Sequence, residues 1–178
     1  MRIALVAVAL ALAPATARAQ TRFTWTPSLA GAVHTRLRGD AEVDGAFDLL
    51  VEGFVGAAGA RGGAFVGGRV TGHGELSASA GAALAIHLSR SDPGTSLVLS
   101  LGGALGSRDG LDPAALARAW WGLRGLIDGS SPYEIAVGLW AEARYHPTDG
   151  AVDLVAGVSV DPWALAAPFR FIAGALSR

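Results

Sequence analysis

The sequence predicts an all-β fold: an up-and-down antiparallel closed β-barrel of about eight strands, with one short helix in a long loop. Apolar and polar side chains alternate over long stretches, most clearly in 132–146, where every ionisable group except two phenols falls on one face. Hydrophobic residues make up 51% of the chain and charged residues 16%, yet no apolar run after the first twenty residues is long enough for a transmembrane helix. The 25 glycines favour strands over a helical bundle.

The first nineteen residues have the pattern of a secretory signal peptide. Arg2 provides the positive charge, 3–13 is an apolar run, and Ala17 and Ala19 flank Arg18 as a small-x-small cleavage site. The apolar run is too short to span a membrane. We therefore expect cleavage after Ala19, which leaves residues 20–178 as a single β-barrel domain.

The first two strands are expected at 24–38 and 46–58. Both alternate, and in the second strand Asp48 and Glu52 share the face opposite a row of large apolar side chains. The acidic, glycine-containing stretch 39–45 between them is typical of a loop.

Three more strands are expected at 65–71, 75–89 and 95–107. The middle one carries an unbroken row of Leu, Ala and Ile on alternate positions, with Glu, Ser and His among the others. The glycines in 72–74 predict a tight reversal, and Ser-Asp-Pro-Gly at 91–94 predicts a turn.

The pattern changes in 108–131, where we expect a long loop that contains a short amphipathic helix. Asp112 is a candidate N-cap and Pro113 suits the first helical position. Apolar residues recur at helical spacing, at Leu116, Trp120, Leu123 and Ile127. The predicted helix covers 113–127, and a strand over 119–127 is the alternative.

The last three strands are expected at 132–146, 151–160 and 169–176. With both termini on the periplasmic side, the longest connection falls on the outer side, as in membrane barrels. The outer connections are then 39–45, 72–74, 108–131 and 161–167.

The polar faces indicate the interior of a narrow, filled barrel rather than a water-exposed surface. They are rich in Gly, Ala and Ser, and their charges are sparse, of both signs and without any Lys. Buried charges must be paired, and Arg is well suited to forked pairing with carboxylates. We expect a lumenal charge network of Arg36, Asp48, Glu52, Arg69, Glu75, Glu134, Glu142, Arg144, Asp153 and Arg170.

The leader, the alternation and the loop asymmetry together resemble the small eight-stranded bacterial outer-membrane barrels, over about residues 22–178. The resemblance implies a Gram-negative outer-membrane location, lipid as the partner of the apolar faces, and a non-enzymatic structural or surface-interaction role. We expect a monomer. The resemblance implies no particular ligand or partner protein.

Two other functions remain open. In a soluble periplasmic, lipocalin-like barrel the apolar rows would line a cavity for an apolar ligand. A barrel-borne hydrolase would need a serine within reach of His87 or His146. The predicted loop also offers a possible interaction site, or a cap over the barrel mouth, made of Arg118, Trp120, Trp121 and Arg124.

Several kinds of site are not supported by the sequence. The chain has no Cys, so it has no disulfide and no thiolate metal ligand. No two of the four histidines have metal-binding spacing, and we expect no cofactor. The formal net charge is −1 and no basic patch occurs, which argues against nucleic acid as a partner.

Overall fold

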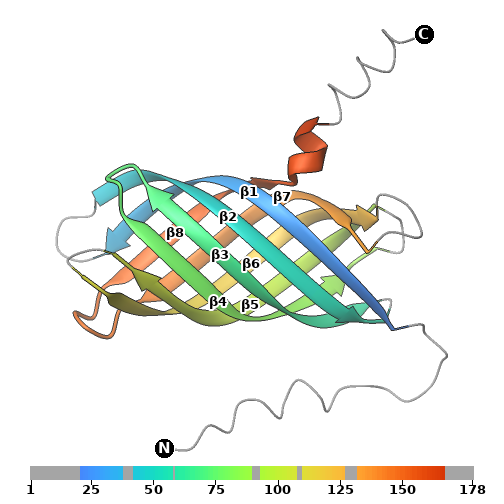
Figure 1. Ribbon diagram of the computed structural model, residues 1–178, viewed down its shortest axis with the longest axis horizontal. Helices are drawn as coiled ribbons and strands as arrows, with labels where there is room; N and C mark the ends of the chain where they lie inside the picture. Colours follow the sequence, from blue (N-terminus) through green and yellow to red (C-terminus); the bar gives the residue numbers. More distant parts are fainter. Residues whose placement is uncertain are drawn as a thin grey trace, which may run out of the picture.

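The structure is a closed barrel of eight antiparallel strands, each paired with its neighbours in sequence and the last paired with the first (Figure 1). It is a computed structural model that describes residues 21–37, 42–57, 59–89, 93–107, 110–126 and 132–166. The predicted fold is confirmed. The strands are β1 (Arg22–Leu37), β2 (Glu42–Gly56), β3 (Ala60–Thr71), β4 (Leu76–His87), β5 (Gly94–Gly106), β6 (Asp112–Leu126), β7 (Glu134–Tyr145) and β8 (Val152–Val160).

The predicted helix over 113–127 is wrong, because 112–126 form the strand β6. Strand β6 pairs with β5 from Gly94↔Arg124 to Gly106↔Asp112, and with β7 along its other edge. Its buried positions follow a period of two from Ala114 to Trp120. The helical spacing of its apolar residues mixes side chains from both faces of this strand.

Because β6 is a strand and not part of a loop, the connections after it lie at the opposite end of the barrel from the one predicted. The turn at 146–151 lies at the same end as the connections 72–75 and 107–111, not at the end of the termini as predicted. The long loop predicted at 108–131 is largely replaced by β6, so the predicted asymmetry of loop lengths is wrong. The barrel closes with β8, and the strand expected at 169–176 lies outside the described residues.

The outward positions of the strands carry no charged residue, while the inward positions carry the charged side chains together with a set of buried apolar ones. Large apolar residues of the outer wall are well exposed, for example Leu84 by 43% and Leu101 by 64%. The alternate positions, which bear Asp48 and Glu142 among others, are buried. A lipocalin-like barrel needs the opposite orientation, so that alternative is not supported.

The wall has a seam near the termini, because β8 ends before its two neighbours do. Its last residue, Val160, pairs with Leu29 of β1 and Val137 of β7, whereas these strands begin at Arg22 and Glu134.

Backbone groups along the seam find other partners. The Trp25 N–H donates to the Pro132 carbonyl at 2.8 Å, and the Asp161 N–H donates to the Ala136 carbonyl at 2.8 Å. Pro27 lies two residues after Trp25, so its backbone also faces the seam. Proline has no N–H, and therefore no backbone donor of Pro27 is left without a partner there.

A short helix over 162–166 follows β8 directly. Asp161 is its N-cap, since its Oδ1 accepts from the Trp163 N–H at 2.6 Å, and Pro162 occupies the first helical position. The Tyr133 hydroxyl donates to the other oxygen of the buried Asp161. Burial and this contact with Asp161 raise the pKa of Tyr133 above its ordinary value. Within the described residues, no helix has the length and apolar character needed to cross a membrane.

Glycines allow neighbouring strands to approach closely inside the barrel. Gly81 and Gly102 face each other across β4 and β5, and Gly122 and Gly138 do so across β6 and β7. A Cβ on Gly102 would lie 2.2 Å from the Ala80 carbonyl oxygen, which is backbone and cannot rotate away.

We expect Gly102→Ala to lower the free energy of unfolding by about 1–3 kcal/mol, the usual range for overpacking. Gly103→Ala is the matched control, since its Cβ would have its nearest neighbour, the Ala114 carbonyl oxygen, at 3.6 Å. Its expected effect is within about 0.5 kcal/mol. Urea unfolding in detergent micelles measures both, and equal effects would contradict the close approach of β4 and β5.

Candidate functional site

A central network of charged side chains crosses the barrel interior. Arg69 of β3 donates two hydrogen bonds to Asp48 of β2, at 2.6 and 2.7 Å, and its Nη2 lies 2.8 Å from Glu142 Oε1 of β7. Arg118 of β6 donates to Glu142 Oε2 at 2.7 Å, and Arg144 donates to Glu142 Oε1 at 2.6 Å. All five side chains are buried. Glu142 thus joins three guanidinium groups from three strands.

Aromatic rings complete the surroundings of this network. The guanidinium carbons of Arg69 and Arg118 lie 5.4 and 4.8 Å from the centre of the Trp140 ring, and Arg118 also lies over Phe65. Cation–π contacts of this kind stabilise a desolvated charge. With three Arg and two carboxylates, the network carries a formal charge of +1.

A second network lies closer to the termini and is formally neutral. Arg61 donates to Glu134 and to Thr24, both at 2.6 Å. Arg124 pairs with Glu52 and lies 3.6 Å from Glu134 Oε2. Phe54 and Trp120 pack against the Arg124 guanidinium. This network joins β1, β2, β3, β6 and β7.

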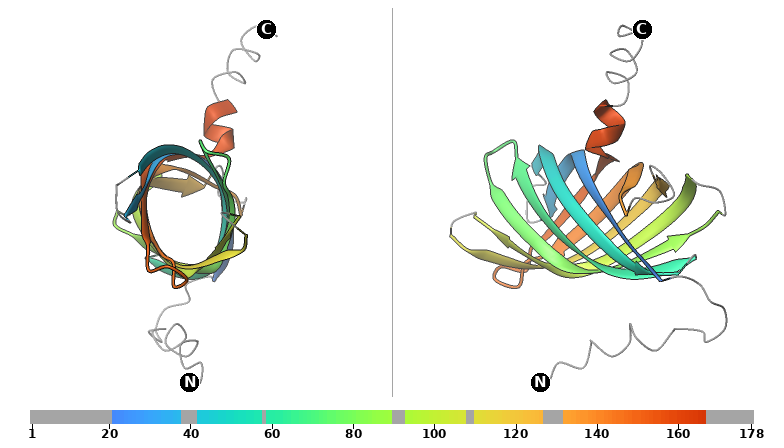
Figure 2. Two further views of the ribbon diagram at one scale, coloured as in Figure 1. Left: turned by 90° about the vertical axis from the view of Figure 1, so that its left-hand side faces the viewer. Right: turned by 45° about the vertical axis from the view of Figure 1, so that its right-hand side comes forward.

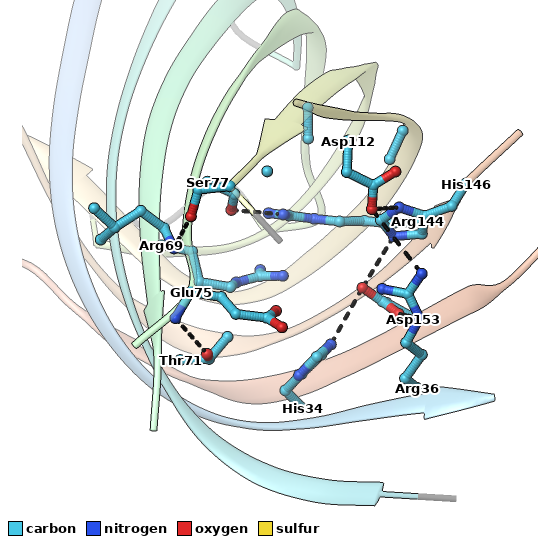
Figure 3. A pocket seen from close by; sticks show the side chains of 15 residues that line it. His34, Arg36, Arg69, Thr71, Glu75, Ser77, Asp112, Arg144, His146 and Asp153 are labelled. Atoms are coloured by element: carbon cyan, nitrogen blue, oxygen red, sulfur yellow. Dashed lines mark hydrogen bonds and ion pairs between the residues drawn. The ribbon is translucent and has the colours of Figure 1, made fainter. Parts of the chain in front are cut away.

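A third group of polar residues surrounds a small cavity at the other end of the barrel, which we call the mouth (Figure 3). His34 and His146 both approach Asp153 Oδ2, at 3.3 and 3.0 Å, and His146 Nδ1 lies 2.7 Å from Asp112. The hydrogen bond of the His146 ring is the one between Nε2 and Asp153, whereas Nδ1 approaches Asp112 without hydrogen-bond geometry.

Ionic contacts also hold the β7–β8 turn against the mouth. Arg36 of β1 donates to Asp149 in this turn at 2.8 Å, and Thr148 donates to Asp112 of β6 at 3.0 Å. Arg36 thus lies among three carboxylates of the mouth, those of Asp112, Asp149 and Asp153.

The mouth cavity has room for very small ligands only. About 30 Å³ is open to water, enough for about two water molecules. Its lining includes Arg69 and Arg144 of the central network, so side chains of that network lie beneath it. Among the described residues, no group of three or more His, Asp or Glu side chains is arranged to hold a metal ion.

The contact between Ser96 and His87 does not have the geometry of a hydrolase site. Ser96 Oγ lies 2.8 Å from His87 Nδ1, while the other ring nitrogen lies 2.6 Å from Arg61, which is a donor only. The ring must accept from Arg61, so its proton lies on Nδ1 and is donated to Ser96. A histidine in this state cannot take a proton from the serine.

Most of the residues expected in a lumenal charge network are brought together in these three groups. Glu75 is half-buried in the lining of the mouth cavity, and Arg170 lies outside the described residues. The placement of the loop residues was wrong: Arg118, Trp120 and Arg124 point into the barrel, and Trp121 is 52% exposed on its outer wall.

Sequence reasoning missed other interior residues, although a signal for one of them was present. Arg61 lies between the expected strands 46–58 and 65–71, yet it is eight residues before Arg69 and therefore points to the same face of one strand, β3. The mouth residues His34, Asp112 and His146 were not assigned to the network. Their proximity depends on the register between the neighbouring strands β6, β7, β8 and β1.

Comparison with known proteins supports the fold. No protein-family model matches the chain, and no curated protein sequence matches it significantly. Among solved structures, it is similar to Neisserial surface protein A (NspA), with a TM-score of 0.56 and 15% sequence identity over 78% of this chain and 96% of that one. A structure described as a de novo design of transmembrane beta-barrels matches with a TM-score of 0.42 and 11% identity, over 76% and 94% of the two chains. The likeness to NspA is one of fold.

Glu142→Gln should destabilise the barrel strongly, because it removes the carboxylate that three guanidinium groups share. Loss of one partner from a buried ionic group typically costs about 3–5 kcal/mol. Asp149→Asn is the control: it removes a carboxylate from the partly exposed pair with Arg36, where less than about 1 kcal/mol is expected. Urea unfolding in micelles compares the two, and a Glu142→Gln barrel as stable as the control would argue against the central network.

Proposed function

We propose that this protein is a monomeric outer-membrane β-barrel of the Gram-negative envelope, exported by a cleaved signal peptide, with a closed lumen and a non-enzymatic structural or surface-interaction role. In this arrangement lipid surrounds the outer wall. The start of β1 and the end of β8 lie on the periplasmic side, and the mouth faces outward.

The observation that carries this proposal is the composition of the outer wall. Alternate positions of all eight strands face outward, and none of them bears Asp, Glu, Arg or His. A continuous apolar surface of this extent is unfavourable in water. A bilayer covers such a surface, and a closed barrel leaves no unpaired strand edge within it.

The interior supports a closed lumen. Charged side chains from opposite sides of the barrel meet at Glu142, and the large side chains Phe65, Trp120 and Trp140 are buried beside the networks. At about eight strands the side chains of a barrel just fill its interior.

Leu84→Arg tests whether the outer wall faces lipid. Arginine on the lipid face costs about 2–4 kcal/mol near the midplane of a bilayer and about 0–1 kcal/mol near its edges. Leu76→Arg is the matched control, because Leu76 is exposed on the same strand but at its end. We expect Leu84→Arg to block assembly into lipid vesicles, and Leu76→Arg to fold.

Gel mobility before and after boiling measures this assembly, since a folded barrel migrates as a compact form until it is boiled. Normal assembly of both variants would contradict the lipid-facing wall. A mature chain that stays soluble without detergent would contradict the membrane location.

Current measurements across planar lipid bilayers test the closed lumen. We expect no stable conductance for the native chain. The double variant Arg118→Ala, Trp140→Ala should conduct, because it removes two large side chains from the middle of the barrel. It also leaves two Arg and two carboxylates in the central network, which is then neutral. Stable conductance of the native chain would show that the lumen is open.

A further inference from the structure

The helix over 162–166 leaves the barrel sideways rather than along its axis. In the end-on view of Figure 2 it projects outward from the wall, on the outside of the ring of strands. It starts at Asp161, where β8 ends and the seam begins. If the barrel axis is perpendicular to a bilayer, this helix runs roughly along the plane of that bilayer.

An aromatic cluster connects the helix to the seam. The Trp25 and Tyr133 rings meet edge to face with their centres 4.9 Å apart, and the Tyr133 and Trp163 rings do so at 6.4 Å. Tyr133 is buried, whereas Trp25 and Trp163 remain 36% and 44% exposed. Trp and Tyr rings gather at membrane–water boundaries, where an apolar body and a polar tip are both accommodated.

The exposed surface of the helix is apolar and continues the outer wall. Leu165 is 51% exposed, and beside the seam Phe23 and Trp25 of β1 are also exposed. The sequence that follows the helix contains Phe169, Phe171 and Ile172 around Arg170.

We propose that the helix over 162–166 is an interfacial anchor that lies along the bilayer at the headgroup boundary of the leaflet nearest the termini. Trp163 and Leu165 enter the apolar side of that boundary. This inference rests on the proposed membrane location.

The anchor also explains how the seam is protected. β8 no longer covers β1 before Leu29, so on that side this part of β1 lacks the strand partner that the rest of it has. Trp25, Tyr133 and Trp163 lie over this part of the wall, and Asp161 holds the helix there through its contacts with Tyr133 and with the helix backbone. Lipid is the occupant that suits both the apolar helix surface and the wall next to it.

Site-directed spin labelling tests the anchor directly, since the chain has no cysteine and one introduced thiol is labelled uniquely. Leu165→Cys is labelled and the protein is reconstituted in phosphatidylcholine vesicles. The collision rate of the label with oxygen, which is apolar, is compared with its collision rate with a water-soluble nickel chelate. We expect an oxygen-to-nickel ratio several-fold higher than that of Pro147→Cys, in the exposed turn at the mouth.

A second reference separates the anchor from the membrane proposal. Leu139→Cys is exposed in the middle of the outer wall and reports whether that wall faces lipid. A high ratio for Leu139→Cys with a Leu165→Cys ratio equal to that of Pro147→Cys would overturn the anchor alone. Low ratios at all three positions would overturn the membrane location.

Spin–spin broadening tests whether a second copy of the chain, rather than lipid, covers the helix. Broadening of the Leu165→Cys spectrum that disappears on dilution with unlabelled protein would mean that a second copy of the chain covers the helix, and this would also overturn the anchor. Absence of broadening, together with the high oxygen-to-nickel ratio, is the result expected for contact with lipid.

Discussion

The structure depends on one constraint: no charged side chain of a strand may point outward. Strands direct successive side chains to opposite faces, so the Asp, Glu, Arg and His positions of the strands share the inward face, and Asp48, Glu142 and Arg144 are buried in the narrow interior. Charges placed there lose their hydration and must find partners within a few ångströms. Glu142 shows the result most clearly, because its two oxygens serve Arg69, Arg118 and Arg144. The apolar wall and the ionic interior are therefore two consequences of the same alternation.

This constraint also favours Arg over Lys for the charged groups of the barrel interior, and the strands carry Arg and no Lys. A guanidinium group can donate to two carboxylates at once and still pack flat against an aromatic ring. Arg118 does both, with Glu142 and Asp48 on its edges and Trp140 on its face. A lysine ammonium has neither the fork nor the flat surface. Glycines such as Gly102 let adjacent strands approach closely beside the large interior side chains, at positions where a methyl group would clash with backbone atoms.

The alternation could be read from the sequence, and it predicted the closed barrel, the inward charges and the outward apolar rows. It failed in β6, where Leu116 and Trp120 face inward and Leu123 faces outward, a set that also fits a helical repeat. The charges of β6 carried the correct signal, because Asp112, Arg118 and Arg124 all have even numbers. Partner choice across the lumen could not be predicted, because it depends on curvature and on the register between strands that are far apart in sequence.

At the seam, residues that would each be unfavourable in or beside a regular strand are accommodated together. Pro27 lies inside a strand, where proline normally removes a ladder hydrogen bond, yet β8 has already ended on the side that its nitrogen faces. Pro132 is next to a barrel strand but supplies the carbonyl that Trp25 needs. Asp161 is buried without an arginine partner among the described residues, but it receives the Tyr133 hydroxyl and the N–H of Trp163. Ending β8 early thus turns the chain outward at the point where a bilayer boundary can hold it.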